Sequence, residues 1–198
     1  ALAPLLKHPV AFGGVGAGLA FLMRSIHLAQ SARIARKQAR KQADASRLDR
    51  LTGLHSRSYG EEILSTLDLS ELRACVIIDV RRFHEINGCF GYTVADDILK
   101  EISARIRTFA PGADIIARVS ADAFVIVSHV LDSEAEGRSI AESLGIILEQ
   151  PYHGDLGLGL DFAIGVAFSG EAGLTDREFT KRVDIALHEA KRKREGAI

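Results

Sequence analysis

The chain has 198 residues, of which 47% are hydrophobic and 26% charged. This balance supports a packed core and excludes a wholly disordered chain. The 25 basic and 26 acidic side chains nearly cancel, so the chain as a whole is not a polycation built to coat nucleic acid or lipid. Its two cysteines, Cys75 and Cys89, are too few for a disulfide scaffold or a four-thiolate zinc site.

The first distinctive segment is an uncharged, mostly small or apolar stretch at residues 10–23. As a helix it would span about 21 Å, which is less than the ~30 Å hydrocarbon core of a bilayer. Two interpretations stay open: the inner part of a transmembrane helix that also uses residues 1–6, or a buried or re-entrant segment. The basic residues that follow favour the membrane, with the rest of the chain in the cytoplasm. We therefore predict a membrane-associated segment at residues 1–24 and localisation to the inner (cytoplasmic) membrane.

A basic helical linker is predicted next, at residues 25–48. Between residues 24 and 50, eight basic side chains stand against two acidic ones, and residues 25–50 contain neither Gly nor Pro. Leu28 and several alanines follow a weak heptad stripe. A solvated connecting helix and a parallel dimer stalk both fit this pattern. Nucleic acid is not an expected partner, because no aromatic side chain is interleaved for base stacking.

Residues 49–198 have the pattern of one globular domain. Helices are predicted where apolar residues recur at three- and four-residue spacing, and strands where short β-rich runs are bounded by turns. In chain order these are a helix at 59–67, a strand at 74–80, a helix at 94–106, a hairpin of strands at 114–119 and 123–130, a helix at 140–148, a strand at 161–168 and a helix at 179–190. The core order β-α-β-β-α-β predicts an α+β, ferredoxin-like fold: a central antiparallel sheet flanked by helices.

Two carboxylates carry most of the chemical information. Asp79 lies in a β-rich run and shares a strand face with Cys75 and Ile77. A carboxylate there is costly to desolvate unless a cation or hydrogen-bond donors meet it, so a turn-capping role and a metal or phosphate role are both open. Asp122 lies at the predicted hairpin tip, where Asp is common. The first strand and the hairpin are neighbours in this fold, so the two carboxylates could share a magnesium ion together with substrate phosphates.

Further polar residues lie between the two carboxylates. Asn87-Gly88 is a turn signal, and the Asn amide can read a purine edge with one donor and one acceptor. Asp96 follows in the first turn of the next predicted helix, where a carboxylate also favours the helix dipole.

These residues belong to three spaced motifs. They are DRLTGL at 49–54 with Arg57 after it, the segment 78–96, and the segment 184–191. In this order they resemble the GGDEF family of cyclic di-GMP signalling domains, over about 140 residues. The resemblance implies a palm-like sheet related to nucleotide cyclases and polymerases. Active members of the family condense two GTP molecules into cyclic di-GMP across a dimer.

The resemblance also implies a site for GTP and Mg²⁺. The metal ligands that it implies are Asp79, the backbone carbonyl of Val80, and Asp122. The nucleotide-binding residues that it implies are Asn87 and Asp96 for guanine, Lys191 for phosphate, and His84 and Tyr92, which replace the family's Lys and His.

Several departures from the family pattern weaken the expectation of catalysis. Ser120-Ala121-Asp122-Ala123-Phe124 stands where the family signature reads GGDEF. Side chains in place of the two glycines are expected to cost about 1 kcal/mol or more each if the hairpin needs positive φ, and Ala123 removes the Glu. Arg81 replaces the second aspartate and is expected to repel magnesium and attract phosphate. The family's product-feedback motif RxxD keeps Asp114 but has Pro111 in place of Arg.

We therefore expect a degenerate GGDEF domain without an intact catalytic set. It would act as a regulatory GTP-binding or interaction module, forming a homodimer through the helical stalk. The resemblance implies that it controls an EAL-type phosphodiesterase domain in cis, beyond residue 198. Two alternatives stay open: a weakly active diguanylate cyclase, and a dimerisation scaffold that binds no nucleotide.

Overall fold

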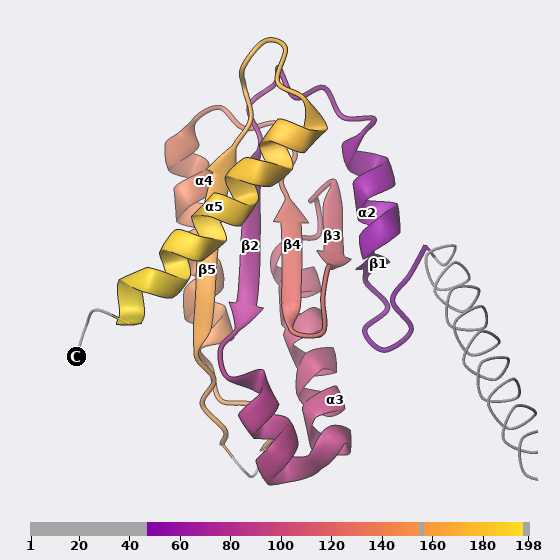
Figure 1. The fold of residues 1–198 in the computed structure, drawn as a ribbon, viewed down its shortest axis with the longest axis vertical. Helices are drawn as coiled ribbons and strands as arrows, with labels where there is room; N and C mark the ends of the chain where they lie inside the picture. The colour runs from indigo at the N-terminus through magenta and orange to yellow at the C-terminus, as the bar shows by residue number, and fades with distance from the viewer. Residues whose placement is uncertain (1–46, 155–156, 196–198) are drawn as a thin grey trace, which may run out of the picture. The chain divides into compact units, whose positions relative to one another are not determined.

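The computed structural model describes residues 47–154 and 157–195, which form a five-stranded sheet with helices on both faces (Figure 1). The predicted membrane segment at 1–24 and nearly all of the predicted linker at 25–48 lie outside the described residues, so both stay predictions. Within the described ranges, no helix combines the length and the apolar character needed to cross a bilayer.

The elements follow the predicted order, with one short strand added. They are β1 (His55–Ser56), α2 (Arg57–Leu64), β2 (Ala74–Val80), α3 (Phe83–Phe109), β3 (Ile115–Arg118), β4 (Ala123–Val127), α4 (Glu134–Leu148), β5 (Phe162–Phe168) and α5 (Asp176–Glu195). The sheet order is β1-β3-β4-β2-β5, in which β1 pairs parallel with β3 and every other pair is antiparallel. Without β1, this is the ferredoxin-like order, so the predicted fold is confirmed.

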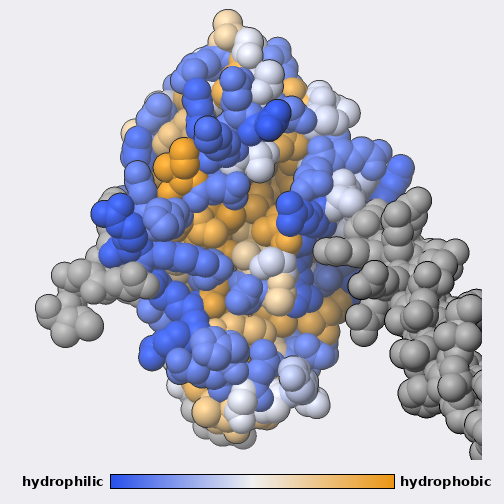
Figure 2. All heavy atoms as spheres, viewed as in Figure 1, coloured by the Kyte–Doolittle hydropathy of each residue, from blue (hydrophilic) through white to orange (hydrophobic). Residues whose placement is uncertain are grey.

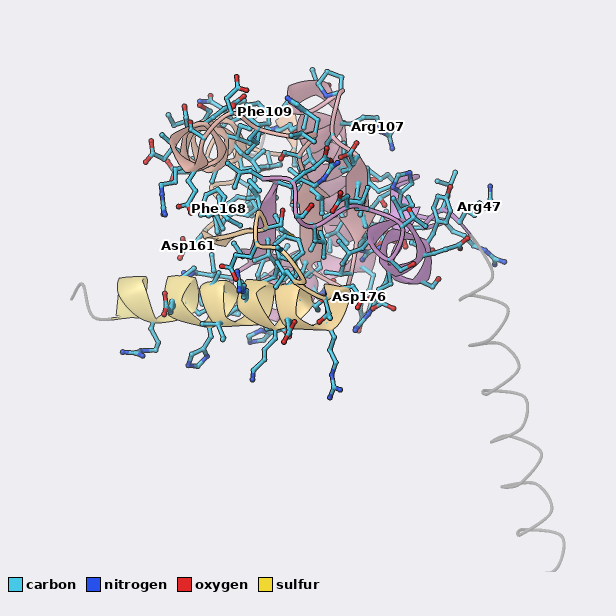
Figure 3. The ribbon with its side chains drawn as sticks, turned by 90° about the horizontal axis from the view of Figure 1, so that it is seen from above. Arg47, Arg107, Phe109, Asp161, Phe168 and Asp176 are labelled. Atoms are coloured by element: carbon cyan, nitrogen blue, oxygen red, sulfur yellow. The ribbon has the colours of Figure 1, made fainter. Side chains whose placement is uncertain are left out.

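Strand β2 lies inside the sheet, between β4 and β5, and its two faces contribute to two hydrophobic cores on opposite sides of the sheet. Val76, Ile78 and Val80 point to the core formed with α3 and α4, whereas Cys75 and Ile77 point to the core formed with α2 and α5. This alternation is the one expected from the sequence. Seen from above, α5 begins at Asp176 on one side of the sheet, and Phe109 at the end of α3 lies on the other (Figure 3).

A glycine in β5 lets α5 lie directly on the sheet. A Cβ at Gly165 would stand 2.6 Å from the carbonyl carbon of Ala186 and 2.8 Å from the amide nitrogen of Leu187. Real side chains do not approach backbone so closely, so this contact requires glycine. The close crossing sets the height of the last turns of α5, which carry Lys191, above β2 and β5.

The predicted turn at Asn87-Gly88 is wrong. Both residues lie inside α3, and the helix breaks instead at Gly91, which has φ 79° and ψ 166°. That backbone conformation strongly favours glycine, whereas Asn87 and Gly88 continue a helical segment anchored by the buried Phe83. The predicted candidate site residues of this region therefore lie on two helical segments separated by Gly91.

Candidate functional site

Asp79, Val80 and Asp122 meet at one end of the sheet. Asp79 is paired in register with Ala123 of β4 and with Ala163 of β5. The next residue, Val80, donates its backbone N–H to the carbonyl oxygen of Asp122 at 3.0 Å. The hairpin tip is thus joined directly to the end of β2, as the neighbouring strands led us to expect.

The carboxylate of Asp79 is met by a cation from the same chain. Lys191 Nζ on α5 lies 2.7 Å from Asp79 Oδ2, and the Asp79 side chain is only 14% exposed. A charge-assisted hydrogen bond of this length offsets part of the cost of removing the carboxylate from water. The structure therefore brings together two of the residues assigned to metal and phosphate, although 112 positions separate them in sequence.

Arg81 does not point to a metal or phosphate position, contrary to expectation. Its Nη2 donates to the carbonyl oxygens of Ala190 and Lys191 at 2.8 and 2.9 Å, and its Nε lies 3.7 Å from Asp161 Oδ2. The side chain is 13% exposed. This guanidinium is engaged by backbone carbonyls of α5, the helix that presents Lys191 to Asp79.

The expected strain in the Ser120–Asp122 hairpin is absent, so that prediction is wrong. Among the residues that the structure describes, only Arg82 and His153 are non-glycine residues with positive φ. The hairpin is closed by Val119 N–H donating to Ala123 O at 2.9 Å and by the Ser120 hydroxyl, 3.1 Å from Asp122 Oδ1. Ser120 and Ala121 thus adopt a turn that accepts ordinary side chains.

Two residues of the degenerate signature are buried on opposite faces of the sheet. Ala123 shares the face of Asp79 and puts a methyl group where the family has a carboxylate. Phe124 is fully buried in the core under α3 and α4. Asp122 is therefore the one carboxylate of this signature, and it is half-buried beside the exposed Ser120 and Ala121.

The predicted nucleotide-binding residues of α3 lie on the two sides of the Gly91 break. His84 is exposed and Asn87 half-buried before the break, while Tyr92, at 79% exposure, and Asp96 are exposed after it. In the described part of the chain, no hydrogen bond or ion pair joins these four residues to the Asp79–Lys191 pair. Their side chains are exposed or half-buried, and among the residues that the structure describes none of them is hydrogen-bonded to another side chain.

Magnesium fits this site only together with phosphate. Carboxylate and carbonyl oxygens are the ligands that Mg²⁺ prefers, and Asp79, Val80 and Asp122 offer them. Within the described ranges, however, no group of three or more His, Cys, Asp or Glu side chains is placed to hold a metal. Two carboxylates and a carbonyl leave several octahedral positions open, which nucleotide phosphates and water would have to fill.

An apolar groove that sequence reasoning missed runs from this site across the sheet, between α2 and α5. It encloses about 280 Å³ and is visible as a hydrophobic hollow on the face shown in Figure 2. Asp79, Ser120 and Ala123 are among its lining residues. The groove is shaped partly by small residues, since a Cβ at Gly60 would stand 3.1 Å from the Ala117 Cβ. No sequence pattern predicts it, because it depends on how far apart two helices lie.

Two motif aspartates have structural partners. Asp114, the remaining residue of the feedback motif, pairs with the buried guanidinium of Arg73, which also contacts Glu71 at 2.9 Å. Asp49 accepts hydrogen bonds from the Thr52 amide at 2.9 Å and hydroxyl at 2.7 Å. Burial raises the pKa of Asp49, but the Thr52 hydrogen bonds and the nearby Arg118 outweigh this effect, so the net pKa is lowered.

The sheet order, Asp79 at the end of β2, Asp122 in the neighbouring hairpin and Lys191 paired with Asp79 define a domain of the nucleotide-cyclase palm class. The family model described as "Diguanylate cyclase, GGDEF domain" matches residues 46–197. The chain therefore belongs to the GGDEF family, and the resemblance seen in the three motifs is confirmed.

Relatives from Pseudomonas aeruginosa agree with this assignment. Diguanylate cyclase TpbB of Pseudomonas aeruginosa (strain UCBPP-PA14) is 32% identical over 156 residues, which cover 75% of this chain and 36% of that protein. Cyclic di-GMP phosphodiesterase NbdA of P. aeruginosa is 29% identical, over 74% of this chain and 19% of that protein. The solved GGDEF domain of P. aeruginosa TpbB (YfiN) superposes with a TM-score of 0.67 at 30% identity, covering 74% of this chain and 89% of that one. The chain spans about a fifth to a third of the length of the two curated relatives.

Proposed function

We propose that this GGDEF domain is a regulatory module of cyclic di-GMP signalling that binds Mg²⁺·GTP without condensing it. The observation that supports this most directly is the state of two neighbouring residues at the end of the sheet, Asp79 and Ala123. Asp79 is neutralised by Lys191 at 2.7 Å, and Ala123, beside it in the sheet, has no carboxylate. Catalysis requires charge stabilisation placed at the reacting atoms, and a methyl group at Ala123 supplies none.

The binding half of the proposal rests on residues that remain accessible. Asn87 and Asp96 keep the amide and carboxylate that can read a guanine edge, and within residues 47–154 and 157–195 neither side chain is hydrogen-bonded to another. Lys191 can turn from Asp79 to a phosphate, because its side chain is 41% exposed. Magnesium held by Asp79, Val80 and Asp122 would neutralise phosphate charge when the nucleotide is bound.

Calorimetric titration of the full chain with GTP and Mg²⁺ tests the binding half. We expect a saturable heat of binding. The affinity for GTP that it yields should fall at least tenfold in Asn87→Ala, because the guanine edge loses a bidentate partner. Arg138→Ala, at an exposed position on α4, is the matched control and should bind as the parent does. Absence of heat up to millimolar nucleotide would contradict GTP binding and favour the nucleotide-free scaffold.

Two alternative functions each have one observation in their favour. The retention of Asp79 and Asp122 at the same sheet end favours a weakly active diguanylate cyclase, which a steady yield of cyclic di-GMP would establish. The Asp79–Lys191 pair favours a scaffold, because the site is electrostatically neutralised without any ligand. If the signalling activity of the complete protein changes neither on addition of GTP nor in the Asn87→Ala variant, the scaffold is supported.

The wider setting is part of the same proposal. We propose a homodimer formed through residues 25–48, a membrane anchor within residues 1–24, and an EAL-type domain in cis whose activity this module controls. A relative named as a cyclic di-GMP phosphodiesterase, of which this chain matches only 19%, supports the last point. Membrane fractionation of the full-length protein and of a variant lacking residues 1–24 tests the anchor. We expect the full-length protein in the membrane fraction and the variant to be lost from it.

A further inference from the structure

We propose that Lys191 is the resident counter-cation of Asp79, that it excludes free divalent metal from the site, and that Arg81 is the residue that positions it. The proposal rests on the proposed function in one respect: metal would enter the site with the phosphates of a nucleotide. It assigns a role to Arg81, the residue that stands where the family has its second aspartate.

The geometry places the ammonium where a metal would bind. Lys191 Nζ donates to Asp79 Oδ2 at 2.7 Å, and the carboxylate is 14% exposed, so the pair is only partly screened by water. A divalent ion that approached Asp79 alone would have to break this hydrogen bond and remain near the displaced positive charge. Both effects oppose binding of the free ion.

A metal–polyphosphate complex does not meet the same barrier. Its phosphate oxygens offer Lys191 a new anionic partner at the moment at which the metal takes Asp79, so no charge is left unpaired. The Asp79–Lys191 pair therefore opposes binding of free Mg²⁺ more strongly than it opposes binding of Mg²⁺ complexed with polyphosphate.

Arg81 fixes the segment of α5 from which Lys191 extends. Its Nη2 donates to the carbonyl oxygens of Ala190 and Lys191 themselves, at 2.8 and 2.9 Å. Its own backbone N–H donates to Asp161 O at 2.8 Å, so the residue is held at both its backbone and its side chain. Arg81 follows Asp79 by two positions, and its guanidinium therefore ties the end of β2 to the backbone that carries the partner of Asp79.

The test measures how tightly the chain binds Mn²⁺ in the absence of nucleotide. The electron paramagnetic resonance signal of the unbound ion reports how much Mn²⁺ remains free. Lys191→Met keeps most of the side-chain length and removes the charge, and we expect it to bind Mn²⁺ about tenfold more tightly than the parent chain. The control is Arg192→Met, which removes the same charge from the exposed neighbouring residue and should change the affinity less than twofold. Adding Asp79→Asn to Lys191→Met should abolish the gain. Far-UV circular dichroism verifies that each variant is folded, and Lys191→Gln serves as a second variant.

The role of Arg81 has its own matched pair of variants. Arg81→Met should tighten Mn²⁺ binding severalfold, because α5 no longer holds Lys191 on Asp79. Arg82→Met removes the same charge from an adjacent side chain that is 70% exposed, and it should have little effect. Equal effects of the two variants would show that Arg81 acts only through its charge and would overturn its positioning role.

The outcomes separate this proposal from the proposed function. A tighter Mn²⁺ affinity in Lys191→Met that depends on Asp79 supports the counter-cation role even if calorimetry detects no GTP binding. An unchanged or weaker Mn²⁺ affinity in Lys191→Met and Lys191→Gln overturns it even if GTP binds. If both hold, the Lys191→Met variant should bind Mg²⁺·GTP more weakly while it binds the free ion more tightly.

Discussion

Substitution of Gly165 by Ala is the sharpest structural test of how α5 is placed above the site. The added Cβ would lie 2.6 and 2.7 Å from the carbonyl carbon and oxygen of Ala186, and 2.8 Å from the amide nitrogen of Leu187. Favourable contacts between carbon atoms lie at about 3.5–4.0 Å, so helix and strand must separate by nearly 1 Å. All three contacted atoms are backbone, and no side-chain rotation can relieve the overlap.

The magnitude follows from two opposing effects. Overpacking of this kind costs about 1–3 kcal/mol, whereas restricting the unfolded chain by Gly→Ala returns about 0.4–1 kcal/mol. At the middle of both ranges the net destabilisation is about 1.3 kcal/mol, which corresponds to a fall in Tm of roughly 3–5 °C for a domain of this size.

Thermal unfolding followed by circular dichroism at 222 nm measures the effect. Gly159→Ala is the matched control, because no heavy atom lies within 4 Å of its added Cβ and its φ is not positive. We expect the control to unfold at the parent temperature or slightly above it. A Gly165→Ala variant that is as stable as the control would refute the close contact between α5 and β5.

Three further predictions concern packing, pH and thiol reactivity. In α4, Gly137→Ala should lower the free energy of unfolding in urea by about 1–3 kcal/mol, because its Cβ would lie 2.5 Å from Phe168 Cε1. Gly145→Ala in the same helix should raise the free energy of unfolding by about 0.5–1 kcal/mol, because the nearest atom to its Cβ lies 3.5 Å away. The lowered pKa of Asp49 means that its carboxylate stabilises the fold above the unfolded pKa of about 3.9 and that this contribution is lost as the pH falls through the folded pKa. Asp49→Asn should therefore cost about 1 kcal/mol in urea unfolding at pH 7 and much less near pH 3, and an equal cost at both would contradict this. Burial raises the pKa of Cys75 to about 12 and Cys89 is exposed, so a thiol reagent at pH 8 should label only Cys89 until the chain is unfolded, as peptide mass mapping can show.

Much of the fold could be predicted because the responsible signals are local. The apolar run of β2 and the helical stripe that includes Ile98, Ile102 and Ile106 are set by burial of one face, and both lie where periodicity placed them. β1, with two residues, is too short to show any period, and it exists because β3 provides a parallel partner. The sequence predicts a turn at Asn87-Gly88, whereas α3 runs through both residues and breaks at Gly91, because Gly88 and Gly91 look alike in sequence and only the backbone conformation distinguishes them.

The candidate site was predictable in its residues more than in its contacts. The motifs identified Asp79, Asp122 and Lys191 individually, and the expected strand order brought the first two together. The pairing of Lys191 with Asp79 depends on how closely α5 packs on the sheet. Gly165 of β5, far from both residues in sequence, allows this close packing because it has no Cβ. The role predicted for Arg81 at a metal or phosphate is wrong for the same reason. Its partners are backbone carbonyl groups 109 and 110 positions away, and no sequence pattern indicates them.

Product formation tests the central claim, which is that the site keeps the groups that bind Mg²⁺·GTP and lacks those that make it react. The full chain is incubated with GTP and Mg²⁺ at a concentration that favours dimers, and cyclic di-GMP is quantified by liquid chromatography and mass spectrometry, beside Asp122→Ala. We predict no cyclic di-GMP above the level of the Asp122→Ala variant, while nucleotide binding is retained in the parent chain. Steady accumulation of the product that disappears in Asp122→Ala would contradict the account.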